Sequence, residues 1–174
     1  MKALGEKRRK QNPLIPGSHH EIKVAVANCQ SSMVIDEDQL KLTVNGVLAH
    51  FGVMSAEVSL AVVDDDEIRR LKNEFFDMDI VTDVISIDMS DDPESHLECE
   101  IIVNAQMAHR VTQEKIDHTA ASELNLYVVH GLLHKLGYED DTEVSHKIMH
   151  AKEDEILTAL GFGKVFRTKD YILL

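Results

Sequence analysis

The sequence predicts a single α+β domain, with a small mixed four-stranded sheet flanked by about five helices. Segments rich in β-branched residues lie in the first part of the chain, whereas the residues from 105 onward follow a helical repeat. The chain has 174 residues and a hydrophobic content of 44%, which is enough for one core. It contains no internal repeat, so the pattern does not suggest a second domain.

Four segments have the pattern of β-strands. Apolar and polar residues alternate over residues 21–28, which is typical of a strand with one buried face. Residues 56–63, 83–89 and 98–104 are rich in apolar and β-branched residues, and an acidic loop over residues 91–95 separates the last two. These segments predict the four strands of the sheet.

Five further segments are predicted to be helical. They span residues 36–51, 64–76, 105–116, 120–136 and 142–160. Leucine and valine recur at helical spacing in the first of them, and four acidic residues open the second, where the helix dipole stabilises negative charge. Gly52, Gly137 and Gly161 stand where glycine commonly ends a helix.

The charged residues are unevenly distributed along the chain. Residues 1–18 are predicted to be a flexible basic tail, and residues 19–174 the folded domain. The whole chain has 31 acidic and 18 basic residues, a balance that disfavours general coating of nucleic acid. It shows no membrane-spanning stretch and no signal-peptide pattern, and we therefore expect a cytoplasmic protein with no membrane partner.

The predicted helix over residues 120–136 has apolar residues on nearly every face, so we expect it to be buried. His130 and His134 stand four residues apart in it, which places both imidazoles on one face. A buried polar group without a partner costs roughly 1–3 kcal/mol, and one cation would serve both rings. The pair predicts a metal site on a zincin-like helix.

A catalytic zinc ion takes three protein ligands and keeps one open position. Gly137 allows a left-handed turn that returns the chain toward the two histidines, and Asp140 is the best-placed ligand after that turn. His146 is the alternative third ligand. His146 and His150 repeat the H-x3-H spacing, but they lie on an amphipathic helix, where we interpret them as surface residues.

Gly131 follows the first histidine of the motif. Zinc peptidases carry a glutamate there as general base, so peptidase chemistry is not expected. Glycine also lets another segment approach the helix closely, at a helix cost of about 1 kcal/mol relative to alanine. Asp83, Ser86 and Lys135 are candidates for contacts with a substrate or with the metal ligands, but no catalytic residue is assigned.

Residues 128–140, V-V-H-G-L-L-H-K-L-G-Y-E-D, resemble the hallmark H-G-x-L-H-L-x-G-Y-D-H of the YbeY family of rRNA maturation endoribonucleases. Residues 82–86 resemble the family's T-D-V-L-S strand, and residues 100–103 stand in the place of its G-D-I-V-I strand. Residues 149–161 follow its C-terminal helix without a gap. The resemblance covers roughly residues 21–162.

The resemblance implies a zinc-dependent, single-strand-specific endoribonuclease with one Zn2+ per chain. Its substrate would be 16S rRNA, in late maturation and quality control of the small ribosomal subunit, and its partners ribosomal RNA and that subunit. The first alternative is a non-catalytic ribosome-assembly factor that retains a structural zinc site. The second is a metal-dependent hydrolase of a small molecule.

Two positions depart from the family pattern. Asp140 stands where the family has its third metal-binding histidine, and Phe76 stands where it has an arginine. An aspartate brings negative charge to the metal, which makes the site less electrophilic. Loss of a guanidinium removes a natural partner of a phosphate. Phe76 and the net acidity favour the assembly-factor alternative.

Overall fold

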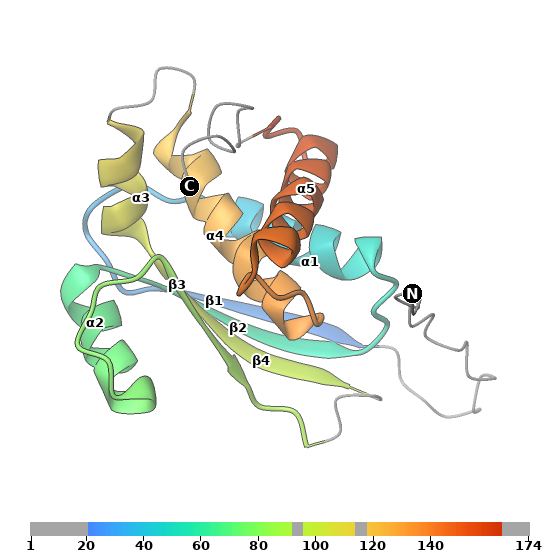
Figure 1. The fold of residues 1–174 in the computed structure, drawn as a ribbon, viewed down its shortest axis with the longest axis horizontal. Coiled ribbons are helices and arrows are strands. Elements are labelled where there is room, and N and C mark those ends of the chain that lie inside the picture. The colour runs from blue at the N-terminus through green and yellow to red at the C-terminus, as the bar shows by residue number, and fades with distance from the viewer. Residues whose placement is uncertain (1–20, 92–95, 114–117, 165–174) are drawn as a thin grey trace.

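A computed structural model describes residues 21–91, 96–113 and 118–164. They form a four-stranded sheet with helices packed on both faces (Figure 1). The predicted α+β class, the mixed sheet and the five helices are confirmed. The predicted basic tail and most of the acidic loop lie outside the described residues. The helix predicted over residues 105–116 ends earlier than expected, at Thr112, and Gln113 already lies in a turn.

The sheet is mixed because one of its strands runs against the others. Its strands are β1 (Ile22–Asn28), β2 (Ala56–Val63), β3 (Val84–Asp88) and β4 (Leu97–Asn104). They lie in the order β1-β2-β4-β3, with β1, β2 and β4 parallel and β3 antiparallel to β4. Asp83, just before β3, therefore lies beside the end of β4, where its carbonyl accepts a 2.8 Å hydrogen bond from the N–H of Asn104.

Each of the five helices follows a polar residue, and in all but the second the side chain of that residue accepts a hydrogen bond from the first turn of the helix. They are α1 (Glu37–His50), α2 (Asp65–Phe76), α3 (Ala105–Thr112), α4 (Ala120–Lys135) and α5 (Glu143–Ala159). Thr119 and Thr142 form capping boxes at the starts of α4 and α5, and each hydroxyl accepts a backbone N–H that has no partner within the helix. Most boundaries fall within two residues of the predicted ones.

Helix α4 occupies the middle of the main hydrophobic core. It contacts β3 and β4 on one side and α1, α3 and α5 on others (Figure 1). All residues over 122–129 and 131–133 are buried. This confirms the prediction of a buried helix, and it means that His130 interrupts an otherwise buried surface.

Helix α2 packs on the opposite face of the sheet. Side chains of β4 alternate between the faces, so Ile101 belongs to the main core, whereas Ile102 packs with Ile68 of α2. The end of α2 thereby reaches β3 from the side away from α4. No helix in the described part of the chain is both long and apolar enough to cross a membrane.

Candidate metal centre

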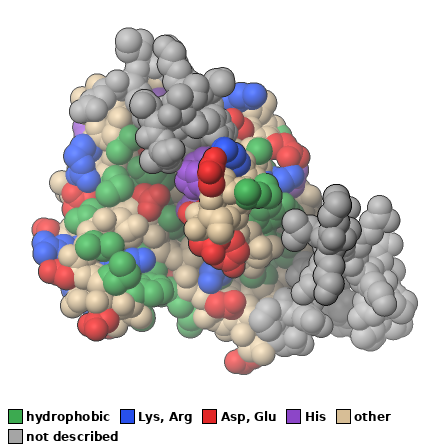
Figure 2. Space-filling view, viewed as in Figure 1, with side chains coloured by type: hydrophobic (Ala, Val, Ile, Leu, Met, Phe, Trp, Pro, Cys, Tyr) green, Lys and Arg blue, Asp and Glu red, His purple; other side chains and the backbone are tan. Residues whose placement is uncertain are grey.

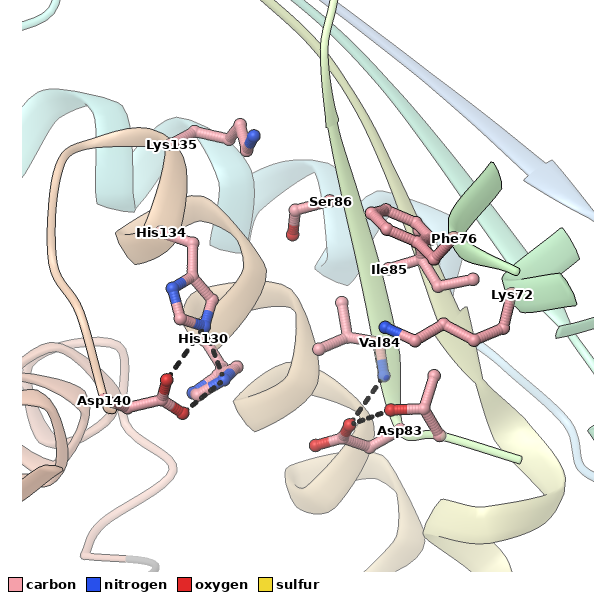
Figure 3. Close-up of a pocket in the computed structure, with 11 residues that line it drawn as sticks. Lys72, Phe76, Asp83, Val84, Ile85, Ser86, His130, His134, Lys135 and Asp140 are labelled. Carbon is pink, nitrogen blue, oxygen red and sulfur yellow. Dashed lines mark hydrogen bonds and ion pairs between the residues drawn. The ribbon is translucent and has the colours of Figure 1, made fainter. Parts of the chain in front are cut away.

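His130 and His134, which we call the first histidine pair, project from one face of α4 toward Asp140 (Figure 3). Their Nε2 atoms lie 3.0 Å apart. Asp140 Oδ2 lies 3.7 Å from His130 Nε2, and Asp140 Oδ1 lies 3.9 Å from His134 Nε2. The structure thus brings together the three side chains that the sequence predicts as ligands, with one potential ligand atom from each within 4.8 Å of the other two.

The turn after α4 explains how Asp140 reaches the histidines. Gly137 has a φ of 89°, a left-handed conformation that strongly favours glycine. The N–H of Tyr138 then bonds back to the carbonyl of Leu133, which reverses the chain at the end of the helix. The predicted left-handed turn is therefore present.

The Nδ1 atoms of both histidines in the first pair have hydrogen-bond partners. His134 Nδ1 lies 3.1 Å from the carbonyl oxygen of Tyr138, which can only accept, so Nδ1 carries the hydrogen. His130 Nδ1 lies 2.6 Å from Glu153 Oε1 and donates to that carboxylate. In neutral rings both Nε2 atoms then carry lone pairs that face each other, an arrangement that needs a proton or a metal ion between them.

The donor set fits a zinc ion in type and spacing. Imidazole nitrogen and carboxylate oxygen bind zinc at about 2.0–2.2 Å, so tetrahedral ligand atoms lie about 3.4 Å apart. The three distances given above, from 3.0 to 3.9 Å, bracket that value. The Nδ1 contacts also match the second hydrogen bond that metal-binding histidines make.

Glu153 of α5 contacts the first histidine pair, although the sequence analysis does not identify it, and Lys72 of α2 is likewise not identified there. Its side chain is 0% exposed, and its two oxygens accept from Nδ1 of His130 at 2.6 Å and from Nδ1 of His150 at 2.7 Å. Burial raises the pKa of Glu153, but the hydrogen bonds and charges of the two histidines outweigh it and lower the pKa overall. For His130 the directions are opposite. Burial lowers the pKa of His130, but the hydrogen bond to Glu153 outweighs burial, so the pKa is raised overall.

A signal for Glu153 was present in the sequence. Met149, Ile156 and Leu157 form the buried stripe of α5, and Glu153 lies at helical spacing within that stripe. A carboxylate on an apolar face needs a buried donor, because an unpaired buried charge is strongly destabilising. The pattern could have indicated a partner across the helix interface, although not which one.

The interpretation of His150 as a surface residue is wrong. Its side chain is 14% exposed, and it turns inward because Glu153 draws its Nδ1 toward the interface with α4. His146 is half-buried and lies against His150, with their Nε2 atoms 2.7 Å apart. Within the described residues, His146 is not part of the group formed by the first histidine pair and Asp140.

A cavity of about 340 Å³ opens beside the first histidine pair. Ser86 lines it from β3, and Asp83 lines it from the segment just before that strand. Lys135 lines it from the end of α4. Lys72 and Phe76 reach it from α2, across the sheet from the histidines (Figure 3). The sequence predicted the first three as candidate contacts, and the structure places all of them at this cavity.

Two lysines of this cavity differ from the other basic side chains. Seven basic side chains in the described residues form ion pairs with carboxylates, namely Lys23, Lys41, Arg69, Arg70, Arg110, Lys147 and Lys152. Lys72 and Lys135 flank the cavity, and neither forms an ion pair with another of the described residues. Lys72 instead lies 4.5 Å from the ring centroid of Phe76, as a cation–π contact. Two ammonium groups thus face a cavity that is also lined by the carboxylates of Asp83 and Asp140, and they are the groups there that could bind an anion.

Gly131 permits the close approach of β3 that its presence in the motif predicted. The Ser86 hydroxyl donates a 3.0 Å hydrogen bond to the carbonyl of Gly131. A Cβ at this position would lie 2.8 Å from Ser86 Oγ and 2.9 Å from Val84 Cγ2. Both separations are too short for real atoms, so glycine is required for this packing.

We expect Gly131→Ala to lower the free energy of unfolding. Overpacking against β3 costs about 1–3 kcal/mol, and the better helix propensity of alanine offsets about 1 kcal/mol of it. Urea unfolding of the metal-free protein measures the difference. A second substitution, Val84→Ala, removes the methyl group in the way and should make Gly131→Ala less harmful than it is alone. An unchanged or increased stability for Gly131→Ala would contradict this packing.

Comparisons with known proteins add an independent observation. A family model described as Endoribonuclease YbeY matches residues 25–161. The Endoribonuclease YbeY of Carboxydothermus hydrogenoformans is 30% identical over 141 residues, which cover 80% of this chain and 98% of that protein. The Endoribonuclease YbeY of Bacillus licheniformis is 35% identical over 119 residues, covering 63% and 75% of the two chains.

The fold also matches a solved structure. The solution structure of TM1509 from Thermotoga maritima superposes with a TM-score of 0.52, over 80% of this chain and 91% of that one. The two sequences are 20% identical, so this likeness concerns the fold alone.

Proposed function

The chain belongs to the YbeY family of endoribonucleases, and from this membership we propose that it is a zinc-dependent enzyme specific for single-stranded RNA. The proposed substrate is 16S rRNA, in late maturation and quality control of the small ribosomal subunit in the cytoplasm. His130, His134 and Asp140 are the proposed ligands of one Zn2+ per chain. The reaction is hydrolysis of an internal phosphodiester bond.

Within the structure, the observation that best supports this proposal is the pair of lysines beside the ligand group. The chain has a net charge of −13, and its other basic side chains within the described residues are, except for Lys164, paired with carboxylates. On the face drawn in Figure 2, Lys and Arg side chains are scattered among Asp and Glu, with no continuous basic surface. Lys72 and Lys135 thus concentrate positive charge where a phosphodiester would meet the metal.

Lys72 can compensate for the absence of an arginine at position 76, where this chain has Phe76. The resemblance places an arginine at position 76, and Lys72 stands one helical turn before it on the same face of α2. Its ammonium group can bind a phosphate oxygen in place of the guanidinium, although without the paired hydrogen bonds of arginine. A positive charge is therefore retained in the cavity despite the substitution, which weakens the argument for a non-catalytic factor.

Phe76 supplies a different kind of contact. Its side chain is 45% exposed at the edge of the cavity, next to the ammonium group of Lys72. Exposed aromatic rings stack on unpaired bases of single-stranded RNA, at about 1–3 kcal/mol per base. A base within a duplex is already stacked on its neighbours, so this contact supports the preference for single strands.

The charged side chains of the cavity have proposed tasks beside the metal ion. When bound, zinc supplies positive charge that polarises a phosphoryl oxygen and makes water more acidic. Lys72 and Lys135 hold the phosphate. Asp83 uses Oδ1 to accept from the hydroxyl of Thr82 and the N–H of Val84, which leaves Oδ2 to accept a proton from the attacking water.

The test of the proposed function compares two forms of one RNA. Zinc-loaded protein is incubated with a single-stranded 16S rRNA fragment and with the same fragment annealed to its complement. We expect cleavage of the single strand, loss of cleavage after chelation, and recovery with added zinc. Intact RNA in both cases, although the protein holds a full equivalent of zinc, would favour the assembly-factor alternative.

We expect Lys72→Gln and Lys135→Gln each to raise the KM for single-stranded RNA. Each variant removes one phosphate contact, so the slope of log affinity against log salt concentration should fall by about 0.7 per lysine. Lys147→Gln is the matched control, because Lys147 pairs with Glu143 and does not line the cavity. Equal effects of all three substitutions would show that overall charge, not the cavity, binds the RNA.

A further inference from the structure

His146 and His150, which we call the second histidine pair, repeat on α5 the geometry of the first pair. They lie four residues apart, with Nε2 atoms 2.7 Å from each other and ring centroids 4.0 Å apart. In the first pair the corresponding distances are 3.0 and 4.6 Å. Two ring nitrogens at this separation need a proton or a cation between them. The reaction proposed above makes no use of the second pair.

A buried carboxylate orients His150 for binding. Glu153 Oε2 accepts from His150 Nδ1 at 2.7 Å, so the hydrogen of the neutral ring is on Nδ1 and the lone pair is on Nε2, facing His146. A carboxylate on the outer nitrogen is the usual partner of a metal-binding histidine, where it fixes the ring and increases its basicity. Glu153 is fully buried, so this partner is part of the folded core.

His146 can change which ring nitrogen carries its hydrogen, as metal binding by the second histidine pair requires. In the metal-free protein its Nε2–H donates to the lone pair of His150. When a metal ion enters, the neutral ring of His146 can carry its hydrogen on Nδ1 instead, which frees Nε2 for the metal. His146 is half-buried, so water can serve its Nδ1. The exchange moves one hydrogen within a neutral imidazole and leaves its charge unchanged.

We propose that the second histidine pair is a second metal site, for a divalent transition-metal ion of the Zn2+ class. Imidazole nitrogens suit zinc, copper and nickel ions, whereas calcium and magnesium ions prefer oxygen. Two protein ligands leave the remaining positions to water, so binding is weaker than at the first pair with Asp140. Glu153 connects the two sites, because one oxygen orients His130 and the other orients His150. The proposal rests on this geometry and does not depend on RNA cleavage.

Zinc titration of the full, chelator-treated chain tests the proposal. Calorimetry with Zn2+ alone should resolve two classes of one equivalent each, a tighter and a weaker. His146→Ala should lower the affinity of the weaker class by at least about 10-fold, the loss typical of changing even a partner of a ligand. His134→Ala should remove the tighter class and leave the weaker one. His146 is half-buried at the surface of α5, so its substitution leaves the core intact.

Control variants separate this site from other histidines. His109→Ala changes an exposed histidine of α3, and a double variant, His19→Ala with His20→Ala, changes two adjacent histidines outside the described residues. Both controls should keep two classes. Saturation of the unmodified chain at one equivalent, an unaltered weaker class in His146→Ala, or its loss in a control would each overturn the proposal.

Discussion

Asp140→Ala is expected to reduce the zinc affinity of the first histidine pair by at least about 100-fold, because losing a partner of a ligand already costs 10–100-fold. Asp140 is the one carboxylate within 4.8 Å of both Nε2 atoms in the described residues. RNA cleavage should fall in parallel, because two histidines hold a metal ion less firmly than three ligands do. Metal analysis of the purified variant and competition with a zinc chelator measure the change.

Two further variants make this experiment specific. Glu139→Ala removes the neighbouring exposed carboxylate, so a loss of zinc there would indicate a general charge effect. Asp140→His restores the histidine that the family carries, and it should retain zinc and cleave at least as well, because a neutral ligand leaves more positive charge on the metal. A full equivalent of zinc in Asp140→Ala would place the third ligand elsewhere.

Glu153→Gln is expected to weaken both the fold and the metal centre. The amide keeps the volume of the carboxylate, but one of its ends can no longer accept, so a histidine Nδ1–H at the interface of α4 and α5 loses its partner. An unsatisfied buried donor costs about 1–3 kcal/mol, and complete removal of a buried charge partner costs about 3–5 kcal/mol. Glu153→Ala should therefore be the more unstable variant.

The matched control for this prediction lies on the same helix. Glu155→Gln changes a glutamate whose side chain is 52% exposed and which pairs with Lys152 and His50 at the surface. Surface ion pairs contribute about 0–1 kcal/mol, so this variant should unfold near the denaturant concentration of the unmodified chain. Urea unfolding without metal, followed by zinc titration, separates the effect on folding from the effect on binding. Equal stability of Glu153→Gln and Glu155→Gln would contradict the role given to Glu153.

Much of the structure around the first histidine pair could be predicted because it depends on local patterns. Apolar residues on every side of α4 indicate burial, and the four-residue spacing places both imidazoles on one face. The left-handed turn at Gly137 and the close packing at Gly131 follow from the missing side chain of glycine. Zinc binding by His130, His134 and Asp140 stays a prediction, to which the structure adds their proximity.

The errors and omissions concern contacts between elements. The sequence places His150 among charged residues of an amphipathic helix and so predicts that it is exposed. One of those residues, Glu153, is buried and binds His150 at the helix interface. Lys72 and Phe76 lie far from the histidines in the sequence and on the other face of the sheet. Only the order of the strands brings the end of α2 to the same cavity.

The sequence by itself determined the fold class, the buried helix with its histidine pair and the turn that returns Asp140 toward it, because each follows from periodicity or backbone conformation within a few residues. The tertiary structure alone decided which polar groups meet across helices. Glu153 joins His130 to His150 only when α5 packs on α4. Such partners are selected by the packing of distant segments, which local sequence patterns do not encode.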